Sequence, residues 1–149
     1  MLRILLLLLW IVPAALSAQE KEGCTYGNCQ NGKGTYVYTN GYRYEGNFVN
    51  GLREGRGMLK GSDGSSYDGM WLQDKFHGQG TYIWPNGSKY TGAWVNGVQN
   101  GYGIYFYANG DKYTGYFKEN LFHGEGKYTW ADGSSEGGIY ENGSLVTKR

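Results

Sequence analysis

The chain has 149 residues and a formal net charge of +1, with 27 glycines, 15 tyrosines and 5 tryptophans. This length suits one modest domain, and the absence of a lysine or arginine cluster excludes a nucleic-acid partner, which needs many cations on one face. Glycine-rich chains are often disordered, but here the glycines recur at fixed spacing between aromatic residues, which favours ordered turns and strands.

Residues 1–18 differ in kind from the rest of the chain. Arg3 is their only charge, an apolar run from Ile4 to Val12 follows, and small residues end it at Ser17 and Ala18. This pattern is typical of a secretory signal peptide cut after Ser17 or Ala18, and the run is shorter than the roughly 20 residues that span a bilayer. We expect a secreted or periplasmic protein, anchored in a membrane if this segment is not removed.

Residues 19–43 contain the two cysteines of the chain, Cys24 and Cys29. In an exported domain, two cysteines five residues apart most simply form a local disulfide, and a zinc site would need two further ligands nearby. Residues 21–43 also fill one degraded 23-residue window. We expect the disulfide to pin a first hairpin that caps the domain.

Residues 44–135 hold four full copies of a 23-residue repeat. The copies open at Tyr44, Tyr67, Tyr90 and Tyr113. Each then has glycine two positions on, an aromatic residue four positions on, a Gly-x-Gly pair and an Asx-Gly dipeptide. A fixed period of this length decides the architecture, because each copy is one structural unit that stacks on the next.

Within a copy, the spacing predicts two β-strands. Tyr-x-Gly-x-aromatic places both rings on one face of the first strand, and a second strand with alternating rings follows the Gly-x-Gly pair. Asx-Gly then reverses the chain in a hairpin turn. The prediction is an all-β, single-layer antiparallel meander of about ten to twelve strands, with no helix beyond the signal peptide.

Two parts of the chain depart from the pattern. Leu59 and Gly61 replace the second-strand rings of the copy at 44–66, which we expect to have the least well packed second strand. Residues 136–149 begin a further copy and fail to complete it, since Glu136 takes the tyrosine position while Tyr140 keeps the aromatic one. Atypical terminal repeats shield the open edges of a sheet.

The motif Tyr-x-Gly-x-Trp/Phe, followed by Gly-x-Gly and Asx-Gly, resembles the MORN (membrane occupation and recognition nexus) repeat over residues 21–143. The resemblance implies a twisted sheet curved into a half-pipe with an aromatic groove. It also implies a scaffold or adaptor that binds protein partners, often as helices, self-associates, and has links to membranes and phosphoinositides. A signal peptide departs from the family's intracellular setting, where inositol-lipid headgroups face the cytoplasm.

The aromatic residues are the candidate functional feature. Rings at a period of two mostly form the core, but a single-layer sheet has no second layer to cover them, so part of the face stays open for binding. Tyrosine and tryptophan suit such a surface because each joins an apolar body to a polar tip. The candidate partner-binding rings are those of the second strands: Tyr82, Trp84, Tyr105, Tyr107, Tyr128 and Trp130.

No catalytic or metal site is predicted. His77 and His123 share a loop position two copies apart, roughly 19 Å at about 4.8 Å per strand, too far to hold one ion. No serine or cysteine at repeat-invariant spacing suggests a nucleophile beside either histidine. The carboxylates scatter over loops without a motivated pair: Glu54, Asp74, Glu119 and Glu125. Gly-x-Gly precedes strands rather than a helix, unlike nucleotide-binding motifs, so no cofactor is expected.

The leading interpretation is a non-enzymatic, exported scaffold that binds a protein partner through an aromatic groove. One alternative is a peripheral membrane or phospholipid-binding module. Another is a carbohydrate-binding protein, because exposed tryptophan and tyrosine rings stack on sugar rings.

Overall fold

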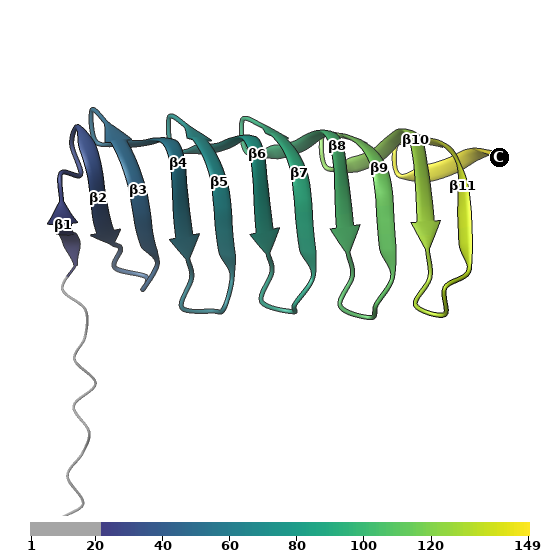
Figure 1. The fold of residues 1–149 in the computed structure, drawn as a ribbon, viewed down its shortest axis with the longest axis horizontal. Helices are drawn as coiled ribbons and strands as arrows, with labels where there is room; N and C mark the ends of the chain where they lie inside the picture. Colours follow the sequence, from purple (N-terminus) through teal and green to yellow (C-terminus); the bar gives the residue numbers. More distant parts are fainter. Residues whose placement is uncertain (1–21) are drawn as a thin grey trace, which may run out of the picture.

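The computed structural model describes residues 22–149, so the predicted signal peptide lies outside the described part (Figure 1). Twelve strands form one antiparallel sheet in sequence order, and residues 22–149 contain no helix. The predicted all-β meander is therefore confirmed. The strands are β1 Gly23–Gly27, β2 Gly32–Val37, β3 Arg43–Val49, β4 Leu52–Lys60, β5 Ser66–Leu72, β6 Lys75–Ile83, β7 Lys89–Val95, β8 Val98–Phe106, β9 Lys112–Lys118, β10 Leu121–Thr129, β11 Ser135–Glu141 and β12 Ser144–Lys148.

Two-residue turns join neighbouring strands along one side of the sheet. Both residues have positive φ in every case, the geometry of the tight hairpin turn that Asn-Gly favours. The turns are Asn50-Gly51, Gln73-Asp74, Asn96-Gly97, Glu119-Asn120 and Asn142-Gly143. The second residue of each turn donates its N–H to a carbonyl oxygen 21 residues earlier, as Gly97 does to Phe76 at 2.8 Å. These bonds fasten each hairpin to its predecessor.

The Gly-x-Gly pairs lie inside the second strands. This corrects the sequence-based prediction, which placed the pairs before those strands. In β6, which starts at Lys75, Gly78 has a φ of 58° and the pairing with β5 shifts between Gly69 and Met70. Such a β-bulge takes up an extra residue and lets the strand continue. His77 and His123 consequently lie within β6 and β10, which corrects their predicted placement in loops.

The core is a row of tyrosines packed directly on glycine. The opening tyrosines of the four copies have no exposed surface: Tyr44, Tyr67, Tyr90 and Tyr113. A Cβ added at Gly80 would lie 2.3 Å from the hydroxyl oxygen of Tyr67, so only glycine leaves room for that ring. The Tyr67 hydroxyl donates to the carbonyl oxygen of Met70 at 2.9 Å, and the other three make the equivalent bond. These buried hydroxyls are therefore satisfied.

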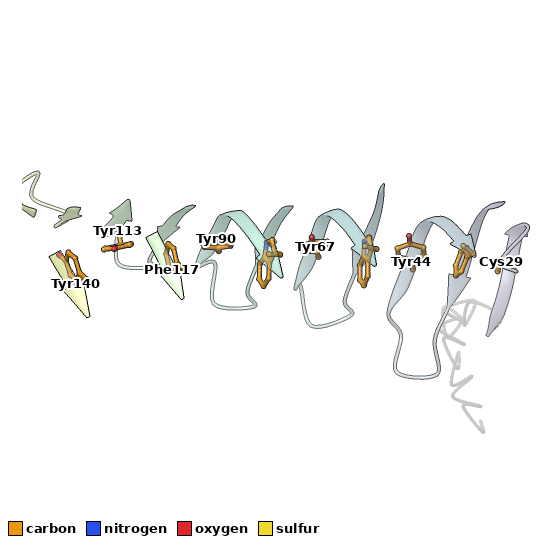
Figure 2. Packing of buried hydrophobic residues seen from close by; sticks show 10 residues of the cluster. Cys29, Tyr44, Tyr67, Tyr90, Tyr113, Phe117 and Tyr140 are labelled. Carbon is orange, nitrogen blue, oxygen red and sulfur yellow. The ribbon is translucent and has the colours of Figure 1, made fainter. Parts of the chain in front are cut away.

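All these rings share one face of the sheet, here called the ring face. Tyr82 pairs with Tyr67 on one side and with Tyr90 on the other, and directly paired residues project to the same side. Figure 2 shows the labelled rings of Tyr67 and Tyr90 on the inner side of the bent strands. The opposite side is called the outer face and carries the exposed rings of Tyr102 and Tyr116.

The copy at 44–66 compensates for its missing rings. Leu59 is partly buried against the core. A Cβ added at Gly61 would lie 2.9 Å from the ring of Tyr42, which belongs to the preceding turn. The Tyr42 hydroxyl donates to Asp63 at 3.1 Å and lies 3.2 Å from the Ser65 hydroxyl. A ring borrowed from the neighbouring hairpin thus occupies the position that sequence reasoning left unfilled.

Candidate functional site: an aromatic ladder on the ring face

The six predicted binding rings form a continuous zigzag, here called the ring ladder. Its ring-centroid separations are 4.8 Å (Tyr82–Trp84), 5.1 Å (Trp84–Tyr105), 4.6 Å (Tyr105–Tyr107), 5.8 Å (Tyr107–Tyr128) and 5.2 Å (Tyr128–Trp130). All five pairs are tilted or edge-to-face, arrangements that aromatic quadrupoles favour. The residues chosen from sequence spacing are therefore brought together along one surface.

The side chains of the ring ladder are partly exposed to solvent, whereas the core tyrosines are fully buried. Five of its side chains are half-buried and Trp130 is 40% exposed. Trp84, Tyr107 and Trp130 are each the first residue after their strand, where the longer turns begin. The turn holds them in place, since the N–H of Trp84 donates to the Ser88 carbonyl oxygen at 2.9 Å. Tyr107 and Trp130 make the equivalent bonds, to Asp111 and Ser134.

A carboxylate that sequence reasoning missed stands beside the ladder. Asp111 accepts a 2.6 Å hydrogen bond from the Tyr128 hydroxyl and a 2.9 Å bond from the Ala131 N–H. The bond from Tyr128 holds the pKa of Asp111 below its usual value, while burial and the nearby carboxylate raise the pKa of Tyr128. Asp111 could have been found from the sequence as a departure from the repeat, because the equivalent positions of the other copies hold Ser65, Ser88 and Ser134.

A cation lies among the rings at the other end of the face. The Arg53 guanidinium carbon lies 4.1 Å from the ring centroid of Trp71 and 5.8 Å from that of Tyr44. The Arg53 Nε–H donates to Asp74 Oδ1 at 2.8 Å, and one Nη2–H donates to the Asp74 carbonyl oxygen at 3.0 Å. Asp74, which the sequence assigned to a loop, thus orients a guanidinium stacked on an aromatic ring.

Hollows occur on both faces. On the ring face, one of about 560 Å³ lies at the N-terminal end beside Tyr36, Tyr38 and Phe48. A larger one of about 640 Å³ lies on the outer face and contains Glu45, Arg56 and Asp68 in its lining. Arg56 and Asp68 approach each other at 3.7 Å across an exposed surface, and charges of both signs line this hollow.

The two cysteines form the expected disulfide at the N-terminal end. Cys29 is buried and joins the same apolar cluster as Tyr44 and Phe48, so the bridge continues the core where aromatic residues are sparse. A Cβ at Gly34 would lie 2.7 Å from the Cys29 sulfur, which shows how closely β2 packs on the bridge.

Within residues 22–149, no group of three or more histidine, cysteine, aspartate or glutamate side chains is placed to hold a metal ion. In the same part of the chain, no helix is long and apolar enough to cross a membrane. The carboxylates singled out from sequence separate: Glu54 lies in β4 and Glu125 in β10, whereas Asp74 and Glu119 lie in tight turns.

The fold and the ladder define a class of β-repeat protein built from stacked hairpins with an open aromatic face. A family model described as MORN repeat matches residues 30–41, 44–66, 67–89, 90–112 and 113–135. The chain therefore belongs to the MORN repeat family. Comparison with curated proteins gives no significant match. The family is generally non-enzymatic, and its repeats commonly take part in protein or membrane interactions.

Proposed function

We propose that this protein is a non-enzymatic scaffold or adaptor that binds a protein partner along the ring ladder. The observation that carries the proposal is the unbroken contact of six half-open rings from Tyr82 to Trp130. Aromatic anchors on a rigid surface supply large contact area at a small cost in conformational entropy. An amphipathic helix laid along the face would present apolar side chains to successive rings.

Export is part of the same proposal. The pattern of residues 1–18 supports it, and the disulfide between Cys24 and Cys29 is typical of proteins from oxidising compartments. Self-association is the other interaction that the fold allows. Within residues 22–149, β1 and β12 each have one unpaired edge, and an unpaired edge can add a strand from another chain.

The experiment compares two matched double variants as baits. Trp84→Ala with Trp130→Ala removes two half-open rings from the ring face, whereas Tyr102→Ala with Tyr116→Ala removes two exposed rings from the outer face. We expect affinity capture followed by mass spectrometry to lose the partner with the first bait and to keep it with the second. Loss with the second bait alone would assign binding to the outer face.

The alternatives predict different ligands for the same baits. Anionic membranes attract clustered lysine and arginine. The ring ladder instead has Asp111 beside it, which disfavours the lipid-binding alternative. Flotation with vesicles of phosphatidylcholine and phosphatidylserine measures this directly. A glycan array tests the carbohydrate alternative, and binding that disappears with Trp84→Ala and Trp130→Ala would favour it over the scaffold.

A further inference from the structure

Asp111 interrupts the internal symmetry of the ring face. Its counterparts Ser65, Ser88 and Ser134 are neutral. The structural task of the position needs no charge, because the Ser88 hydroxyl accepts the Ala108 N–H at 3.2 Å just as Asp111 Oδ1 accepts the Ala131 N–H. The carboxylate therefore adds something that the fold does not require.

The charge of Asp111 is not neutralised within the described part of the chain. The five ion pairs of residues 22–149 use other carboxylates: Glu45, Asp74, Asp68, Glu136 and Glu125. The three donors from residues 22–149 that reach Asp111 are neutral: the Tyr128 hydroxyl, the Asn109 amide and the Ala131 N–H. Among the described residues, Asp111 Oδ1 has one donor, and a carboxylate oxygen has two lone pairs, so this oxygen retains capacity for a cation.

The chain contains its own example of how a cation fits this kind of surface. Arg53 stacks on Trp71 while Asp74 holds its Nε–H. A guanidinium suits both neighbours at once, since its plane stacks on a ring and its edge donates to a carboxylate. Asp111 accepts a hydrogen bond from the Tyr128 hydroxyl, and the Tyr128 ring contacts the half-open rings of Tyr107 and Trp130, so a carboxylate again lies close to aromatic rings.

We propose that Asp111, with Tyr107 and Trp130, binds the guanidinium of an arginine on the partner segment. This inference rests on the proposed function and specifies the partner as a basic peptide. The arginine would stack on the exposed face of the Trp130 indole and donate to Asp111 Oδ1. Its position relative to the partner's apolar anchors would fix the register of the segment along the ladder, because the three serine counterparts offer no such charge.

The test uses random-peptide display on the purified protein, followed by affinity measurement with resynthesised peptides. Asp111→Ser is the matched variant, because serine occupies this position in three other copies. In each enriched peptide, the arginine is replaced by citrulline, a neutral side chain of nearly the same shape. We expect this replacement to weaken binding to the unaltered protein about tenfold and to leave binding to the Asp111→Ser variant unchanged.

The outcomes separate this inference from the proposed function. Peptides that depend on Trp84 and Trp130 but show no fixed arginine, or an equal citrulline effect on both proteins, would overturn the arginine site and leave the scaffold function standing. Lysine in place of arginine at the fixed position would overturn the guanidinium assignment. Failure to enrich any peptide that depends on the ladder would contradict both.

Discussion

Phe76 stacks on Tyr67 with ring centroids 3.8 Å apart and an interplanar angle of 17°. Phe122 stacks on Tyr113 in the same way, at 3.7 Å and 8°. The corresponding position of the alternate copies holds Arg53 or Gln99. The backbone N–H of Arg53 donates to Asp74 Oδ1 of the next copy, and that of Gln99 donates to Asn120 Oδ1, both at 2.9 Å. Successive copies therefore alternate at this position between a stacked phenylalanine and a residue whose backbone N–H donates to a polar turn side chain.

Replacing Arg53 tests this alternation. Arg53→Ala removes the stacking on Trp71 and leaves Asp74 without its cation, so we expect a loss of about 2 kcal/mol in the free energy of unfolding. Arg53→Phe introduces the residue found at this position in the copies with stacked rings, Phe76 and Phe122, and should retain most of the stability. Urea denaturation measures the free energy of unfolding of both variants. An equal decrease in the two variants would show that stacking at this position is unimportant.

The tyrosine-on-glycine packing gives a sharper stability prediction. Gly80→Ala places a methyl group 2.3 Å from the Tyr67 hydroxyl oxygen and should cost about 3 kcal/mol through overpacking. Gly137→Ala is the control, because the nearest atom to its Cβ is 3.6 Å away. Thermal unfolding followed by circular dichroism should separate the two variants. A Gly80→Ala protein as stable as the control would mean that Tyr67 does not lie over Gly80.

The disulfide should stabilise the N-terminal hairpin. A bridge across five residues contributes about 2 kcal/mol by restricting the unfolded chain. Reduction should lower the melting temperature and speed amide exchange in β1 and β2, with little change in β9 to β12. An unchanged melting temperature after verified reduction would remove the capping role.

Alkaline pH should unfold the protein cooperatively. Burial raises the pKa of Tyr44 and of Tyr90 to about 12, above the value of about 10 for an unfolded chain. A raised folded pKa means that the folded state keeps its proton longer, so stability is complete below about pH 10 and falls as pH rises towards 12. Tyrosinate absorbance at 295 nm and circular dichroism should therefore change together for the buried rings. Ionisation of these rings without loss of strand signal would contradict their burial.

The repeat spacing was sufficient to predict the sheet and the shared ring face. The disulfide was predicted from two cysteines that lie five residues apart behind an export signal. The Gly-x-Gly bulge was misread, since its glycines also suit a loop. Tyr42 was missed because it fills a gap in the neighbouring copy, a contact that no local pattern encodes. Arg53 and Asp111 each occur in one copy alone, so a search for repetition passes over them.

Hydroxyl-radical footprinting of the protein, free and bound to its captured partner, tests the location of the binding surface most directly. Trp130 is 40% exposed on the ring face, and Tyr102 is 54% exposed on the outer face, so both are accessible in the free protein. We predict that the partner protects Trp130 from oxidation and leaves Tyr102 as reactive as before. Protection of Tyr102 with Trp130 unchanged would contradict binding through the aromatic ladder.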